Sequence, residues 1–221
     1  MMRAQQVLMI DIAEIVRQFA ILAVPVLMAI TFHEVAHGYV AYLLGDPTAK
    51  QAGRLTFNPI KHLDPIGALA LFIVKIGWAK PVPVNPAYFS NPRQGMILVS
   101  LAGPVTNFVL AVCFALVFHA LFWLFGQSAS EQVIRVVQPV VYMAQAGVLV
   151  NIGLGIFNLL PVPPLDGSNI LAGLLPPRYA QIYQQQSKYG FILLILLFLT
   201  GAVQKVIVPV IYGLASFLLP M

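Results

Sequence analysis

Three long apolar runs constrain the fold of this chain more than any other feature of its sequence. They cover residues 19–44, 96–125 and 136–160. Each can form a helix that crosses the hydrocarbon core of a bilayer, which takes about 20 apolar residues. Only 9% of the 221 residues are charged, whereas a soluble domain carries about 25%. The sequence therefore predicts a polytopic α-helical membrane protein with a core of three transmembrane helices.

Two shorter apolar regions accompany this core. Residues 66–78 are too few to cross comfortably and are predicted to dip into the membrane, within a partly extended segment over about 53–90. Inside it, Arg54-Leu55-Thr56-Phe57 alternates like a short strand. The apolar residues of about 187–219 predict one or two C-terminal helices, arranged as a hairpin or as one broken helix. We expect a single domain over 1–221, with its catalytic core at about 19–175.

Charge and cysteine content exclude several classes. Twelve Lys and Arg residues against seven Asp and Glu give a net charge of +5. Because the basic residues are scattered singly, they predict no nucleic-acid partner. The lone Cys113 allows no intramolecular disulfide. Residues 1–11 lack the layout of a cleaved signal peptide, so we expect the first apolar run to be retained as its own insertion signal.

The string His33-Glu34-Val35-Ala36-His37 carries the chemical signal. On a helix, His33 and His37 lie about 40° apart and one turn from each other, so both can reach one metal ion. This H-E-x-x-H spacing is the zincin pattern of two zinc ligands and a general base. Ionisable residues are costly inside an apolar span and rarely occur there without a function. The alternative is a polar face satisfied by neighbouring helices or lining a proton path.

A catalytic zinc site takes three protein ligands, so a third is expected at a similar depth. Of the seven acidic residues, Asp166 is the best candidate, because the prolines after the 136–160 run unwind the chain and allow the carboxylate to turn inward. The alternative is a solvated loop aspartate beside the Gly167 turn.

The motifs together resemble those of the site-2 protease family of intramembrane zinc peptidases, most of all its small prokaryotic branch without PDZ or CBS domains. The matching strings occur in the family's order between about residues 30 and 170: His33-Glu34-x-x-His37, Asn58-Pro59-Ile60-Lys61-His62-Leu63-Asp64-Pro65, Gly103-Pro104-x-x-Asn107, and Asn158-x-x-Pro161 followed by Leu165-Asp166-Gly167.

The resemblance implies a zinc metalloendopeptidase that cleaves membrane-spanning or membrane-associated protein segments in a prokaryotic cell membrane. One zinc ion per chain would be held by His33, His37 and Asp166, with Glu34 activating the attacking water. By the same resemblance, Asn107 and Asn158 would line the cleft and contact the substrate backbone or steady the oxyanion.

The direction of the helices offers a test of this ligand set. The two histidines lie in the C-terminal half of the first span, and Asp166 follows the end of the 136–160 span. One ion can bind all three only if these helices are parallel, which requires 66–78 to enter and leave on one face. The basic residues between the first two spans would then share that face, which the positive-inside rule makes cytoplasmic, so the active site would lie toward the cytoplasm: Lys50, Arg54, Lys61, Lys80 and Arg93.

Other functions remain open at this level. A transporter or channel with a metal or proton site is the main alternative, although no repeated halves are seen, and an inactive scaffold is another. His62 would shape the cleft, bind an accessory metal or stabilise a turn, whereas His119 is interpreted as a packing or lipid-interface residue. The sequence does not indicate the substrate, the regulation or whether the chain forms a homo-oligomer.

Overall fold

The computed structural model describes residues 2–74, 77–126 and 130–220, and helices dominate these residues. The long helices are α1 (Met2–Leu43), α4 (Pro92–Phe125) and α5 (Glu131–Asn158). The remaining elements are shorter: α2 (Thr48–Gln51), η1 (Pro59–Lys61), α3 (Pro65–Val74), η2 (Pro86–Tyr88), α6 (Asp166–Leu174), α7 (Pro177–Gln185), η3 (Ser187–Tyr189), α8 (Gly190–Leu199) and α9 (Ala202–Leu218).

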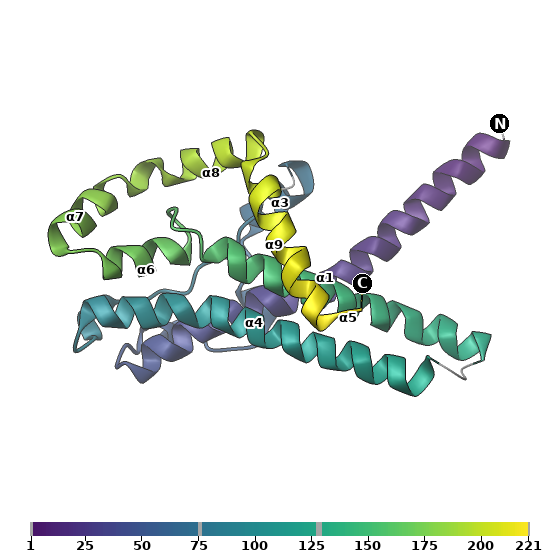
Figure 1. Ribbon diagram of the computed structural model, residues 1–221, viewed down its shortest axis with the longest axis horizontal. Helices are drawn as coiled ribbons and strands as arrows, with labels where there is room; N and C mark the ends of the chain where they lie inside the picture. Colours follow the sequence, from purple (N-terminus) through teal and green to yellow (C-terminus); the bar gives the residue numbers. More distant parts are fainter. Residues whose placement is uncertain (1, 75–76, 127–129, 221) are drawn as a thin grey trace.

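The three long helices form the core, and each of the three pairs is in contact. In Figure 1, α1 and α5 run in the same direction while α4 runs opposite to both. The end of α1 and the start of α4 therefore lie at one end of the bundle (Figure 1). Helices α1 and α5 are therefore parallel. Ligands on α1 and in the segment after α5 can bind one ion only in such an arrangement.

Small residues allow these helices to approach closely. Ala111 and Ala115 of α4 face Ala144 and Val148 of α5 in one buried cluster. Between the same helices, a methyl group placed on Gly147 would lie only 2.4 Å from the ring of Phe114. Since helices in lipid gain no hydrophobic driving force from each other, close van der Waals contact of this kind holds them together.

The outer faces of the long helices are apolar, as a lipid environment demands. Glu14–Leu43, Pro92–Phe125 and Glu131–Asn158 are each long and apolar enough to span a membrane. Large apolar side chains such as Val109, Leu116 and Phe122 of α4 are exposed. The predicted three-helix membrane core is confirmed.

The segment between α1 and α4 differs from the prediction in one detail. Residues 54–57 form no strand, and among the described residues of the segment the only ladder contact is an isolated bridge between Leu63 and Ala79. A buried guanidinium, that of Arg54, binds the carbonyls of Lys80 and Pro81 in place of a neighbouring strand. Side-chain donors thus satisfy backbone that a β-ladder would otherwise pair.

The C-terminal part continues from α6 through α7 and α8 to α9, and α9 returns to pack against α5 (Figure 1). The chain from Pro177 to Leu199 and helix α9 meet at an angle of 76°. The break falls at Gly201, whose φ of 71° lies in the left-handed region that glycine adopts without strain. The sequence left a hairpin or a broken helix open, and the structure has two helices joined at this bend.

Candidate metal centre and active site

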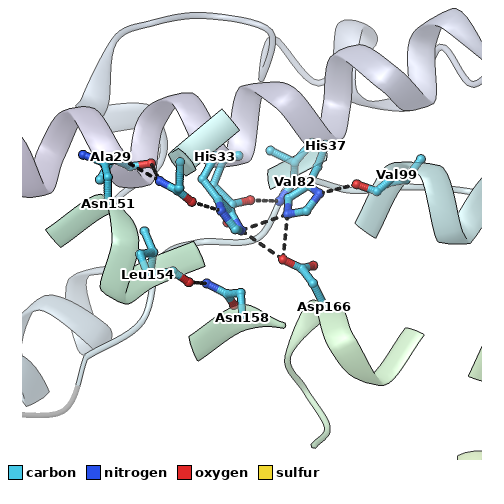
Figure 2. Close-up of polar contacts among 11 residues, drawn as sticks. Ala29, His33, His37, Val82, Val99, Asn151, Leu154, Asn158 and Asp166 are labelled. Carbon is cyan, nitrogen blue, oxygen red and sulfur yellow. Dashed lines mark hydrogen bonds and ion pairs between the residues drawn. The ribbon is translucent and has the colours of Figure 1, made fainter. Parts of the chain in front are cut away.

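Helix α1 brings the two histidines to one point inside the bundle. His33 and His37 are both buried, and their Nε2 atoms lie 3.0 Å apart. Figure 2 shows the two rings turned toward the same spot from successive turns of the helix. The i, i+4 spacing thus has the geometric effect that the sequence predicted.

Asp166 approaches this spot from the opposite side as the first residue of α6. Its Oδ2 lies 3.1 Å from Nε2 of His33 and 3.3 Å from Nε2 of His37 (Figure 2). A carboxylate at the N-terminus of a helix is favoured by the helix dipole, which suits this placement. In the part of the chain that the structure describes, these three residues are the one group of His, Cys, Asp or Glu arranged to hold a metal ion.

The hydrogen bonds on the far side of each ring show which nitrogen is available. Nδ1 of His33 lies 2.6 Å from the side-chain oxygen of Asn107, and Nδ1 of His37 lies 2.7 Å from the carbonyl oxygen of Val99. Both partners are acceptors, so each Nδ1 carries the proton and each Nε2 presents a lone pair. The buried Oδ2 of Asp166 has no hydrogen-bond donor among the residues that the structure describes.

Three acceptor atoms therefore face one another without a donor between them, an arrangement that a cation stabilises. Tetrahedral zinc at about 2.0–2.1 Å from each ligand separates its ligands by about 3.3–3.4 Å. The observed separations of 3.0, 3.1 and 3.3 Å are close to this value. Nitrogen and carboxylate oxygen are also ligands that zinc accepts. The residues present fit a zinc ion.

Helix α4 closes this centre from the side, and it does so with a glycine. A methyl group built on Gly103 would lie 2.6 Å from Nε2 of His37 and 2.7 Å from Nε2 of His33. Such contacts are shorter than real Cβ atoms make, so any side chain here would enter the space that a bound ion uses. The absence of a side chain at Gly103 keeps the centre open.

Glu34 projects beside the two histidines and contacts the extended segment. Its Oε2 accepts a hydrogen bond of 2.8 Å from the backbone N–H of Val82, and the side chain is buried. The backbone before Val82 is fixed in turn by Arg54, whose guanidinium donates to the carbonyl oxygens of Lys80 and Pro81 at 2.6 and 3.0 Å. The extended backbone is thus held against the acidic member of the zincin motif.

A second anchor of the same segment is Asp46, just past the end of α1. One of its oxygens accepts from the N–H of Asn85 at 2.6 Å, and the other accepts from the N–H and hydroxyl of Thr48. Burial alone would raise the pKa of Asp46, but these hydrogen bonds to the charged form outweigh it and lower the pKa. Asp46 therefore remains a carboxylate at neutral pH and keeps residue 85 next to α1.

The two asparagines expected at the cleft differ in burial and in hydrogen bonding. Asn107 is fully buried behind His33, and its amide is already bonded to His33, Ala29 and Asn151. Asn158 turns its amide back to donate to the carbonyl oxygen of Leu154 on its own helix at 3.0 Å (Figure 2).

The remaining histidines both have ordinary partners. His62 is fully buried, with Nε2 2.8 Å from the carbonyl oxygen of Thr56 and Nδ1 3.4 Å from the guanidinium of Arg54. Both ring nitrogens are therefore engaged, which favours the structural role over an accessory metal. His119 lies 2.8 Å from the carbonyl oxygen of Leu218 through Nε2.

Sequence reasoning gave no role at this centre to four residues that shape it: Gly103, which it named only as part of a motif, and Asn151, Arg54 and Asp46. A signal for Asn151 was present, because an amide inside an apolar span has the same cost that drew attention to the histidines. No comparable signal marked Arg54 or Asp46, which lie in a polar segment where charged residues are common.

Comparison with known proteins identifies the class to which the chain belongs. Residues 21–202 match the model of peptidase family M50. The chain is 41% identical over 188 residues to "Putative zinc metalloprotease YwhC" of Bacillus subtilis, covering 85% of this chain and 84% of that protein. It is 29% identical over 203 residues to "Putative zinc metalloprotease Rip2" of Mycolicibacterium smegmatis, covering 86% and 71%. A more distant relative, "Zinc metalloprotease MJ0392" of Methanocaldococcus jannaschii, is 26% identical over 164 residues, covering 74% and 37%. No solved structure gives a significant match.

The chain therefore belongs to peptidase family M50, the site-2 protease family. It is an intramembrane zinc metalloprotease, an integral membrane hydrolase that acts on protein substrates. The resemblance found in the sequence motifs is confirmed, and the family match does not favour the transporter or channel alternative.

Proposed function

We propose that His33, His37 and Asp166 hold one zinc ion per chain and that Glu34 is the general base of peptide hydrolysis. The observation that carries this assignment is the triangle of acceptor atoms, Nε2, Nε2 and Oδ2, with sides of 3.0, 3.1 and 3.3 Å. Among the described residues no donor satisfies Oδ2, and this atom is buried although the Asp166 side chain is 15% exposed, which supports a metal ligand over a solvated aspartate.

Zinc supplies Lewis acidity, which polarises a scissile carbonyl and makes the attacking water more acidic. The protein supplies the proton transfers. Glu34 has one oxygen held by Val82, and we assign the other, Oε1, to take the proton from the water and deliver it to the leaving amine. Burial of Glu34 among apolar helices strengthens this role by excluding bulk water.

We assign the substrate as a transmembrane segment that unwinds before cleavage, because a helix has its carbonyls tied up in internal hydrogen bonds. The extended backbone near Val82 lies next to Glu34, and strand addition along it would present an unwound peptide to the base. Asn158, on the last turn of α5, remains our candidate for a contact to this peptide. The whole chain, 1–221, would act as one domain.

The test is a pair of variants measured for both zinc content and cleavage of a model transmembrane substrate in detergent. Glu34→Gln is expected to retain zinc and lose turnover by about 10²–10⁴-fold, the usual contribution of general base catalysis. Asp166→Asn is expected to lose both zinc and turnover. Loss of zinc in Glu34→Gln, or stoichiometric zinc in Asp166→Asn, would contradict the assignment.

We also propose that the centre faces the cytoplasm of a prokaryotic cell. The end of α1 and the start of α4 flank a segment that carries Lys50, Lys61 and Lys80, and the positive-inside rule places such loops in the cytoplasm. Cysteines introduced at Lys61 and Arg93, in a Cys113→Ser background, are expected to react with an impermeant thiol reagent in inverted vesicles only. Labelling of either cysteine in intact cells would overturn this orientation.

A further inference from the structure

A chain of side-chain hydrogen bonds lies behind His33, on the side away from the candidate metal centre. The side-chain oxygen of Asn107 lies 2.6 Å from Nδ1 of His33, and the amide nitrogen of Asn107 donates to the side-chain oxygen of Asn151 at 2.9 Å. The amide nitrogen of Asn151 donates to the carbonyl oxygen of Gly147 at 2.9 Å. The chain therefore links α5 through α4 to the histidine on α1 (Figure 2).

Two backbone carbonyls fix the direction of this chain. The carbonyl of Gly147 can only accept, so Asn151 must direct its nitrogen there and its oxygen toward Asn107. The amide nitrogen of Asn107 donates to that oxygen and also to the carbonyl of Ala29 at 3.2 Å. The oxygen of Asn107 is thereby left for His33, where it can only accept. The order of donors and acceptors thus requires the tautomer of His33 that carries its proton on Nδ1.

The burial of the two amides shows how closely the helices are fitted around them. Asn107 and Asn151 are both 0% exposed. A buried amide costs free energy unless its donors and acceptors are satisfied. Burying such a pair in an apolar bundle therefore costs free energy. The hydrogen-bond chain that the pair forms ends at a ring nitrogen of His33.

His37 provides an internal comparison, because its Nδ1 is held at 2.7 Å by the main-chain carbonyl of Val99. That support is part of the backbone of α4 and needs no particular side chain. The support of His33 depends on two side chains, since Asn107 binds the ring and Asn151 binds Asn107. The two candidate ligands therefore differ in whether their orientation can be changed by substitution.

We propose that Asn151 and Asn107 form a relay that fixes the tautomer and orientation of His33 and thereby sets the affinity of the site for zinc. Both are positioning residues, since they act through the histidine and not on the substrate. The inference rests on the proposed zinc site and deepens it. Partners of this kind behind metal-bound histidines typically change metal affinity by about 10–100-fold.

The test measures zinc affinity by chelator competition in detergent, in a Glu34→Gln background, so that the readout is independent of turnover. Asn107→Leu removes the acceptor with little change in volume and is expected to weaken zinc binding by about 10–100-fold. Asn107→Asp keeps an acceptor for His33 and should bind zinc more tightly than Asn107→Leu. Asn151→Leu, which frees Asn107 without touching His33, should give a smaller loss, of about 3–10-fold.

Ile152→Ala serves as the matched control for general loosening of α5. Ile152 adjoins Asn151 in sequence, is 2% exposed and packs in the apolar cluster. Its truncation should lower the melting temperature of the metal-free protein while leaving zinc affinity within about twofold, because additivity holds for sites without shared partners.

Each outcome decides the proposal. Zinc affinity in Asn107→Leu equal to that of the parent, an Asn107→Asp variant no better than Asn107→Leu, or an Ile152→Ala variant as weak as Asn151→Leu would overturn the relay. A parent protein that binds no zinc would instead overturn the metal site of the proposed function, so the two failures are distinguishable. The spectroscopic counterpart is the ¹⁵N NMR signal of His33, which should report a proton on Nδ1 in the parent and lose that preference in Asn107→Leu.

Discussion

The helical core and the extended wall support the same centre by different physical means. The helical core comprises α1, α4, α5 and α6. The extended wall comprises the described residues of 44–74 and 77–91, in which irregular and extended backbone joins the short helices α2, η1, α3 and η2. In the core, helices approach closely through small residues, and each of the two candidate histidine ligands is held by a buried neighbour. In the wall, irregular backbone is held by individual polar side chains, chiefly Asp46 and Arg54.

This difference assigns separate tasks to the two regions. The three candidate ligands come only from the core, so metal affinity should respond to changes there. Among the described residues, the wall reaches the centre through one hydrogen bond, from Val82 to Glu34. The wall should therefore influence the positioning of base and substrate and leave metal binding unchanged. Substitutions that separate zinc binding from turnover can test this division.

The largest effect is expected in the core, for Gly103→Ala. The added methyl group would lie 2.6 Å from Nε2 of His37 and displace both imidazoles. Overpacking costs about 1–3 kcal/mol, so zinc affinity should fall by about 10–100-fold and turnover should fall with it. Chelator competition and a cleavage assay on the same preparation measure both quantities.

Gly213→Ala in α9 is the matched control, because a methyl group there meets no atom within 4 Å. It should leave zinc affinity and turnover unchanged and stabilise the helix by about 0.5–1 kcal/mol, the difference in helix propensity. Tight zinc binding by Gly103→Ala would show that the core tolerates expansion at the centre and would remove the basis of the comparison.

The core is also the region that the sequence predicted well, since its signals are local and periodic. The apolar runs gave three spanning helices, and the i, i+4 histidines could be placed on one helix face without knowing any partner. The parallel course of α1 and α5, required by Asp166, agrees with the structure as well. What the sequence did not contain was the close approach of Gly103 to the histidines, which depends on how α4 packs against α1.

The asparagines show the limit of transferring a role from a motif. Asn107 was expected to face the cleft, yet the packing of α1 against α4 buries it behind His33. Which face of a helix a polar residue occupies follows from the period of 3.6, but which neighbour it meets is a tertiary property. The contacts of the wall were harder still to predict from the sequence. Arg54 binds carbonyl groups that lie 26 and 27 residues away, and such a pairing leaves no periodic signal.

A smaller effect, confined to turnover, is expected in the wall for Arg54→Met. The substitution keeps an unbranched apolar stem but removes the donors that hold the carbonyls of Lys80 and Pro81. The backbone at Val82 should then shift relative to Glu34, and a displacement of about 1 Å at a reacting group can cost about a hundredfold in rate. Zinc content and affinity should remain those of the parent, since no candidate ligand lies in the wall. Arg54→Lys keeps the charge but not the forked geometry, so its turnover should lie between that of the parent and that of Arg54→Met. Lys61→Met, at an exposed position nearby, serves as the control. A measured loss of zinc in Arg54→Met, with Lys61→Met normal, would mean that the wall and the core form one support and not two. Full turnover in Arg54→Met would mean that the contact between Val82 and Glu34 persists without the clamp, and that the helices alone position the base.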